Sequence, residues 1–409
     1  MNPTSKLLLT LLSLLADTTT TFPLATHGAA LAELGFSATD MVVGCLPREQ
    51  DALLAFKRGV KSDPLGLLTS WRQDGGDHDC CRWRGISCSN LTGHVIKLQL
   101  NGAYVDERQE TLGLVGSLRR LYSLEILNIV SCYLSANMTE LLEMLSHGSK
   151  KLRQLKMAMN DISGTLPVGM LQQFADLDIL DFRNNNLTGH VSTEIGMLTS
   201  LTYMDLSHNN LSGVITEEHF ASLKRLTYMD LSYNSLRIAV DPGWIAPFRL
   251  QHACFASCQM GPQFPSWLQG QVDITYFDIS IFGITDKLPD RFWTTFSKGP
   301  LPSELIVPQN HMEVLILSSN KLSGRIPSFS RTLHTATSHR SIKEQFLRNY
   351  LSGKIPDKIG SSRSLESLDL SRNKLSGEIP LSLSNLSYLG DLDLSHNNLS
   401  GKNTIRITT

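Results

Sequence analysis

Leu201-Thr-Tyr-Met-Asp-Leu206-Ser-His-Asn209-Asn-Leu-Ser-Gly213 contains the pattern that decides the fold of this chain. The pattern reads L-x-x-L-x-L-x-x-N-x-L-x-G, with Met204 in its second apolar position. Its asparagine recurs along the chain, with a step of 24 residues from Asn185 to Asn209 and 25 residues from Asn209 to Asn234. The members of this series are Asn160, Asn185, Asn209, Asn234, Asn320, Asn349, Asn373 and Asn397. One short unit cannot bury its own apolar face, so neighbouring units must stack on one another.

The period and the pattern together predict a leucine-rich repeat, whose units span about 20–29 residues. Alternation within each unit predicts one short strand, with its leucines pointing inward and the residues between them pointing outward. These strands would align in one sheet on the concave side. The expected fold class is therefore an α/β repeat solenoid, a leucine-rich repeat right-handed superhelix with a parallel concave β-sheet. Such a scaffold favours a binding role over catalysis.

The segment after the asparagine ends in Ile-Pro in three units, at Gly324–Pro327, Gly353–Pro356 and Gly377–Pro380. Proline prevents a continuous helix on the convex side and favours extended or 3₁₀ segments. This L-x-G-x-I-P ending resembles the plant-specific class of the repeat. The resemblance implies added twist and a second short sheet.

Composition and the N-terminus indicate an extracellular protein. The net charge is −1 and no basic block occurs, which argues against nucleic acid or an anionic membrane surface as a partner. Residues 1–30 are predicted to be a secretory signal peptide, with Lys6 before the apolar run Leu7–Ala16 and an uncertain cleavage site after Ala30. A disordered or mistranslated N-terminus is the alternative. No later segment holds the ~20 apolar residues of a membrane helix.

Six N-x-S/T triplets are candidate glycosylation sites and support the extracellular assignment, although several lie in the repeat's own N-x-L-[ST]-G loop. Their acceptors are Asn90, Asn137, Asn186, Asn210, Asn385 and Asn398.

The region before the repeats is predicted to be a cap over residues 45–90, because a solenoid end exposes apolar surface and a strand edge. Ala52, Leu53, Phe56 and Val60 share one helical face, and Asp63-Pro64 is expected to close that helix. The region also holds four cysteines, at positions Cys45, Cys80, Cys81 and Cys88. Adjacent cysteines rarely bond each other, which leaves two pairings open.

The string from Arg48 to Leu100, with Asp79-Cys80-Cys81-x-Trp83-x-Gly85-Ile86-x-Cys88, resembles the N-terminal cap of plant leucine-rich repeat proteins. The resemblance implies the disulfides Cys45–Cys80 and Cys81–Cys88. Residues 256–268 and 277–280 resemble the middle of plant receptor-like protein ectodomains.

Three further cysteines lie within the repeats. Cys132 and Cys258 occupy the asparagine position of their units and are predicted to be buried free thiols. Cys254 alternates with inward-facing Ala253 and Phe255, so it is expected on the solvent side as an unpaired thiol.

The repeat pattern predicts two repeat regions, 91–319 and 349–401, around an irregular segment at 320–348. The steps from Phe282 to Asn320 and from Asn320 to Asn349 are 38 and 29 residues, and Ser341, Glu344 and Phe346 stand at strand positions. Compared with the receptor-like proteins it resembles, the chain is expected to have lost middle repeats and most of a non-repeat island; a genuine short loop is the alternative. Residues 402–409 form a non-repeat tail, which suggests a shortened form.

No catalytic constellation, metal site or cofactor site is predicted. Asp205, Asp230, Asp369 and Asp393 share one slot of the repeat, and His208 and His396 share another, so both sets are interpreted as repeat features. The candidate ligand-binding residues are instead outward-facing side chains of the concave side, where tyrosines suit recognition. These candidates are Arg183, Tyr203, His208, Tyr228, Tyr233, His252 and Tyr276.

The resemblance implies a kinase-lacking plant receptor-like protein of the defence or developmental type, at the plasma membrane in its full-length members and secreted in the form given. Its expected partners are a peptide, protein or glycan ligand and, for an anchored form, a membrane receptor kinase. Two alternatives are a secreted inhibitor of microbial cell-wall hydrolases, similar to the polygalacturonase inhibitors, and a non-functional truncated product.

Overall fold

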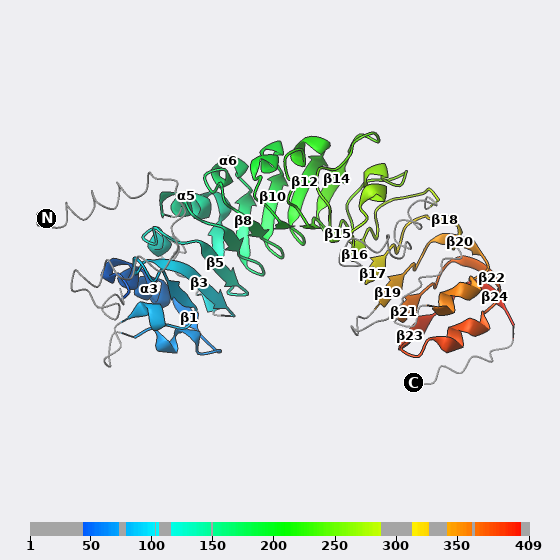
Figure 1. Cartoon of the computed structure of the whole chain (residues 1–409), viewed down its shortest axis with the longest axis horizontal. Coiled ribbons are helices and arrows are strands. Elements are labelled where there is room, and N and C mark those ends of the chain that lie inside the picture. Colours follow the sequence, from blue (N-terminus) through cyan, green and yellow to red (C-terminus); the bar gives the residue numbers. More distant parts are fainter. Residues whose placement is uncertain are drawn as a thin grey trace, which may run out of the picture.

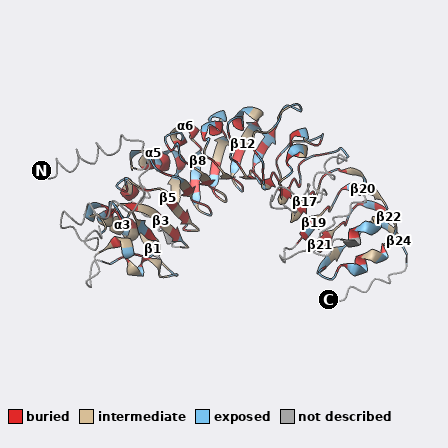
Figure 2. Cartoon of the chain, in the orientation of Figure 1, coloured by how far each residue is buried: buried red, intermediate tan, exposed pale blue. Residues whose placement is uncertain are grey.

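A computed structural model describes residues 44–72, 79–102, 104–105, 116–148, 150–287, 313–326, 342–361 and 365–401. These residues form an arc-shaped solenoid with the cap at one end and the last repeats at the other (Figure 1). Buried side chains run along the arc between its inner and outer faces (Figure 2). The predicted signal peptide at 1–30 and the tail at 402–409 lie outside the described residues.

The inner side of the arc carries one sheet, which has thirteen strands among the described residues (Figure 1). In spatial order these are β2 (Ile86–Cys88), β3 (Val95–Asn101), β5 (Ile126–Val130), β7 (Gln154–Lys156), β9 (Ile179–Asp181), β11 (Tyr203–Asp205), β13 (Tyr228–Asp230), β15 (His252–Cys254), β16 (Tyr276–Asp278), β17 (Val314–Ile316), β19 (Ile342–Gln345), β21 (Leu365–Asp369) and β23 (Asp391–Asp393). All neighbours are parallel except β2 and β3. The predicted concave parallel sheet is therefore confirmed.

The outer side holds a second layer, as the Ile-Pro endings implied. One sheet contains β6 (Ser135–Asn137), β8 (Asp161–Thr165), β10 (Asn186–His190), β12 (Asn210–Ile215) and β14 (Ser235–Ile238); another contains β18 (Ser323–Arg325), β20 (Tyr350–Gly353), β22 (Lys374–Glu378) and β24 (Asn398–Ser400). Most remaining convex segments are short: α6 (Val168–Leu171) and 3₁₀ turns at Thr193–Met197, Glu217–His219, Ser266–Gly270, Asp357–Ser361 and Leu381–Asn385. Only α5 (Met138–Gly148) is a longer convex helix within the described residues.

The recurrent asparagine joins each repeat to the one before it. Asn234 Nδ2 donates to the Leu206 carbonyl of the preceding repeat at 2.9 Å and to Leu231 in its own turn at 3.1 Å. Its Oδ1 accepts the Leu211 N–H at 3.0 Å. The same donor and acceptor pattern recurs at Asn160, Asn185, Asn209, Asn320, Asn349, Asn373 and Asn397.

The slot before the asparagine has a left-handed backbone in each of these turns, including His208 (φ 52°), Tyr233 (φ 56°) and His396 (φ 56°). His208 and His396 are thus features of the repeat, as predicted. Two turns replace the asparagine with cysteine. Cys132 and Cys258 are buried thiols that form no disulfide, as predicted, and Cys258 Sγ donates to the Leu231 carbonyl at 3.4 Å.

The cap begins with α3 (Pro47–Arg58), and the disulfides Cys45–Cys80 and Cys81–Cys88 are those that the resemblance implied. The helix ends earlier than expected, because Gly59 is its C-cap and Val60 begins β1 (Val60–Ser62), which pairs with β4 (Tyr104–Val105). Asp63 instead accepts the N–H groups of Leu67 and Leu68, so its side chain holds the first two residues of the 3₁₀ helix Leu67–Ser70, whose N-cap is Gly66.

A buried carboxylate ties the cap to the first strand of the repeats. Glu49 on α3 is 1% exposed, and its Oε2 accepts the Val95 N–H at 2.7 Å. Its Oε1 lies 2.8 Å from His94 Nδ1. Trp71 and Trp83 stack on each other in the core of the cap, with ring centroids 5.5 Å apart. The cap therefore continues the solenoid core through both apolar and polar contacts.

The inner sheet also continues through the part of the segment 320–348 that the structure describes. β17 pairs with β16 on one side and with β19 on the other. In β19 and the residue after it, Glu344 and Phe346 are buried at positions where leucines are expected, and Ile342, which pairs with Leu365, is buried as well. Ser341 lies outside the described residues.

Candidate ligand-binding face

Four rings on four neighbouring strands form a continuous stack on the concave face. Tyr203, Tyr228, His252 and Tyr276 are successive register partners on β11, β13, β15 and β16. Their ring centroids are 4.0, 3.9 and 4.4 Å apart, and each pair is stacked. The prediction that Tyr203 and Tyr228 stack at equivalent positions is confirmed, and the stack extends over four repeats. We call these four residues the aromatic row.

A second, shorter stack lies in the turns that follow the strands. His208 and Tyr233 have ring centroids 4.3 Å apart, and both side chains are exposed. Their left-handed backbone places them at the carboxyl-terminal edge of the inner sheet. They widen the exposed aromatic surface beside the aromatic row.

On three of these four strands, β11, β13 and β16, a carboxylate follows the ring two residues further along the strand. Asp205 Oδ1 accepts the Ser207 N–H at 3.1 Å, and Asp230 and Asp278 accept the N–H groups of Ser232 and Ser280 at 2.9 Å. Asp369 and Asp393 make the same bond to the residue two positions on. These aspartates therefore hold the turn of each repeat, which agrees with their interpretation as a repeat feature.

Burial shifts the ionisation of this face. Burial, with a further contribution from Asp205, raises the pKa of Asp230 to about 7. Burial also raises the pKa of Tyr203 and of Tyr276 to about 12 and lowers the pKa of His252 to about 4. The aromatic row is therefore uncharged at neutral pH, and burial raises the pKa of the neighbouring Asp230 and Asp278 carboxyls, which disfavours their ionisation.

Arg183 lies at the N-terminal end of the aromatic row. Its Nη1 is 3.5 Å from carboxylate oxygens of both Asp181 and Asp205 and donates to the Tyr203 hydroxyl at 3.3 Å. Burial lowers the pKa of Arg183, but these acidic neighbours outweigh it and raise the pKa overall.

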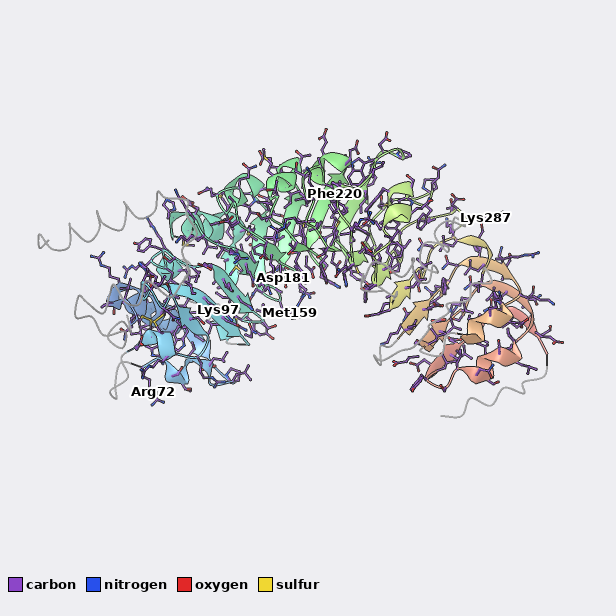
Figure 3. The ribbon with its side chains drawn as sticks, viewed as in Figure 1. Arg72, Lys97, Met159, Asp181, Phe220 and Lys287 are labelled. Carbon is purple, nitrogen blue, oxygen red and sulfur yellow. A yellow bond between two sulfur atoms is a disulfide. The ribbon has the colours of Figure 1, made fainter. Side chains whose placement is uncertain are left out.

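Figure 3 shows Asp181 on the inner side of the arc and Phe220 on the outer side.

Replacing Arg183 with glutamine should destabilise the protein in a pH-dependent way. Burial raises the pKa of Asp181, and the charge of Arg183 opposes that rise. Without this charge, the pKa of Asp181 should rise further in the variant. A carboxyl with a raised folded-state pKa supports folding at low pH, and that support is lost as pH rises through the folded-state pKa. We expect a loss of about 2 kcal/mol near neutral pH and little loss at about pH 4, measured by urea unfolding.

Arg153→Gln is the matched control, because Arg153 is 58% exposed and lies 3.5 Å from Asp178 in a similar ion pair. A surface pair of this kind should change stability by no more than about 0.5 kcal/mol. An Arg183→Gln loss of equal size at both pH values would contradict the electrostatic explanation.

The expectation that Cys254 faces solvent is wrong. Strand alternation does place it on the concave side, yet it is only 4% exposed. Its Sγ lies 3.1 Å from His252 Nε2, and Asp230 and Asp278 are its register partners on either side. The His252 ring and the two flanking aspartates surround the thiol, so this outward-facing side chain is buried. Burial raises the pKa of the thiol.

The six candidate glycosylation asparagines are all exposed. Asn137, Asn186, Asn210 and Asn398 belong to strands of the outer sheets, while Asn90 lies in the cap and Asn385 in a convex 3₁₀ turn. Glycans at the four outer-sheet sites would leave the aromatic row uncovered. Their modification stays a prediction.

A hollow of about 350 Å³ lies on the outer side, beside the end of β14. Its lining includes Arg237, Met260, Pro262 and Trp267. None of the candidate ligand-binding residues lines it. The concave face thus remains the surface that gathers those candidates.

The fold and the disulfide-bonded cap define a leucine-rich repeat protein with its own N-terminal domain. Comparison with known families agrees: the family described as "Leucine rich repeat N-terminal domain" matches residues 46–89, and leucine-rich repeat families match residues 199–252 and 364–386. The chain therefore carries a leucine-rich repeat N-terminal domain and leucine-rich repeats, and it is similar to plant receptor-like proteins.

One such relative is receptor-like protein EIX1 of Solanum lycopersicum, 32% identical over 337 residues. That match spans 80% of this chain and 26% of the relative, and the first relatives matched are all covered to about a quarter of their length or less. Two ectodomains of Arabidopsis thaliana receptor kinases share the fold. The GASSHO1/SCHENGEN3 ectodomain has a TM-score of 0.58 at 23% identity. The match spans 85% of this chain and 44% of that ectodomain. HAESA, solved with the peptide hormone IDA and the co-receptor SERK1, has a TM-score of 0.56 at 22% identity, over 87% of this chain and 67% of its own.

Of the helices in the described ranges, none combines the length and the apolar composition that crossing a bilayer requires.

Proposed function

We propose that this chain is an extracellular ligand-recognition protein of the plant receptor-like type, which binds a peptide or protein ligand on its concave face in defence or developmental signalling. The aromatic row is the observation that carries the proposal, because four partly exposed rings occupy equivalent slots of neighbouring repeats. The relationship to receptor-like proteins and the peptide-bound HAESA ectodomain support it. By the same analogy, a membrane receptor kinase is the proposed signalling partner.

The stacking geometry favours a peptide over a glycan. Each inner ring of the row is covered on both faces by its neighbours, since the centroids are only 3.9–4.4 Å apart. The row therefore presents ring edges, whereas sugars are commonly held against open ring faces. Tyrosine and arginine offer rigid contact area and hydrogen bonds to a polypeptide.

Selection of peptides from a random displayed library on the immobilised protein, followed by affinity measurement with synthetic peptides, tests this proposal. Tyr228 lies inside the row, so Tyr228→Ala should remove a central contact and open the stack. A residue of this kind contributes about 2 kcal/mol at an interface, which corresponds to about a 30-fold weaker affinity.

The control is Tyr350→Ala, because Tyr350 is an exposed tyrosine on the outer strand β20, where Lys374 lies over its ring. The Tyr350→Ala variant should bind the selected peptides with the same affinity as the unmodified protein. The proposal fails when the selected peptides bind the Tyr228→Ala variant as tightly as the parent protein.

A further inference from the structure

Strand β15 departs from its two neighbours at both concave slots. At the ring slot, β13 and β16 carry Tyr228 and Tyr276, whereas β15 carries His252. At the turn-holding slot, β13 and β16 carry Asp230 and Asp278, whereas β15 carries Cys254. One strand thus exchanges a phenol for an imidazole and a carboxylate for a thiol, two residues apart on the same face.

The exchanged side chains meet a carboxylate from the neighbouring strand. Cys254 Sγ lies 3.1 Å from His252 Nε2, and Asp230 is the register partner of Cys254. The three donor atoms of Asp230, His252 and Cys254 all lie within 4.8 Å of one another. We propose that these three residues form a binding site for a borderline-soft divalent cation, for which Zn²⁺ is the best match.

The donor set and its spacing fit such an ion. Zn²⁺ takes thiolate, imidazole and carboxylate ligands together, with bonds of about 2.0–2.3 Å. Those bonds place tetrahedral sulfur and nitrogen ligands about 3.5 Å apart, so Cys254 and His252 need to separate by only a few tenths of an ångström. Three protein ligands leave a fourth position, which faces the concave side because His252 and Asp230 are only half-buried.

The surroundings also favour a cation. Asp230 and Asp278 flank Cys254 in register, and Asp205 is the next carboxylate along the row. Burial raises the pKa of the Asp230 carboxyl and of the Cys254 thiol, and the charges of Asp205 and Asp278 add to both shifts. A doubly charged ion would offset this excess of acidic groups and would displace the protons of the thiol and the carboxyl on binding.

The competing arrangement is a hydrogen bond in which the Cys254 thiol donates to neutral His252 Nε2 and no ion takes part. Cobalt titration separates the two, since thiolate bound to Co²⁺ gives a charge-transfer absorption in the near ultraviolet that a thiol does not. The purified chain, with intact cap disulfides, is treated with a chelator, desalted and titrated with Co²⁺ and then with Zn²⁺. We expect one equivalent of Co²⁺ to bind with this band, and Zn²⁺ to displace it.

Two variants restore the residues of the neighbouring strands and so preserve the repeat. His252→Tyr should weaken Zn²⁺ binding by at least about tenfold. Loss of a group that only supports a metal ligand already costs about 10–100-fold in affinity, and His252 would be a ligand itself. Cys254→Asp should abolish the cobalt band. The control is Cys258→Asn, which replaces another buried thiol with the asparagine usual at that position of the repeat. It should bind Co²⁺ and Zn²⁺ as the parent protein does.

A parent protein without the cobalt band, a band that survives Cys254→Asp, or Zn²⁺ affinity unchanged by His252→Tyr would each overturn the proposal. Thermal unfolding of the metal-free variants shows that they are folded, so a loss of binding reports on the site. The experiment needs no peptide ligand, so its outcome is independent of the proposed recognition function.

Discussion

Asn234→Ala is expected to destabilise the solenoid by about 4 kcal/mol, because it leaves several buried backbone groups without partners. Asn234 is 9% exposed and donates to the carbonyls of Leu206, Leu231 and Ser232. Its Oδ1 accepts the N–H of Leu211, which is itself buried. Alanine has no donor or acceptor in its side chain, so it can replace none of these bonds.

The variant should also uncouple neighbouring repeats. Two of the lost bonds, those to Leu206 and from Leu211, cross from one repeat to the previous one. The stability of a repeat array depends on such nearest-neighbour interfaces, so the unfolding transition should become broader as well as shift to lower denaturant. Guanidinium unfolding followed by circular dichroism measures both changes.

The matched control is Asn210→Ala in unglycosylated protein, since Asn210 is an exposed residue of β12. A surface change of this kind should stay within about 0.5 kcal/mol. Asn234→Cys should fall between the two, because Cys258 shows that a thiol in this slot can donate to one carbonyl. Equal stability of Asn234→Ala and Asn210→Ala would refute the role assigned to the asparagine ladder.

The regular part of the fold could be predicted because every repeat forms its turn and buries its apolar face with the same residue types at the same positions. The asparagine bonds span one repeat, and the inward leucines need only the next unit to be buried. The stack of Tyr203 on Tyr228 follows from register alone. For the same reason, the aspartates could be recognised from the sequence as a repeat feature, whereas their bonds to the turn are seen only in the structure.

Contacts that depend on the identity of several neighbours could not be predicted. Cys254 is buried because of what lies on β13 and β16, and strand alternation carries no information about that covering. The pairing of Arg183 with Asp181 and Asp205 joins two strands through long side chains. In the cap, Glu49 reaches Val95 across 46 residues of sequence, which no local pattern encodes.

The two cap disulfides should differ in what they contribute. Cys45 and Cys80 are 35 residues apart in sequence, whereas Cys81 and Cys88 are 7 apart. Closing the longer loop removes more conformational freedom from the unfolded chain, about 4 kcal/mol against about 2.5 kcal/mol in the chain-entropy description. The paired substitution Cys45→Ser with Cys80→Ser should therefore destabilise the cap more than Cys81→Ser with Cys88→Ser.

Hydrogen exchange of α3 and β2 measures this locally, which matters because a solenoid need not unfold in one step. The stacked pair Trp71 and Trp83 gives an independent fluorescence signal from the same cap. Cys132→Asn is the control, since it removes a cysteine that lies outside the cap and forms no disulfide. If losing the Cys81–Cys88 bridge exposes α3 more than losing Cys45–Cys80 does, loop length does not govern the cap's stability, and the anchoring of β2 against β3 through Cys88 is the stronger effect.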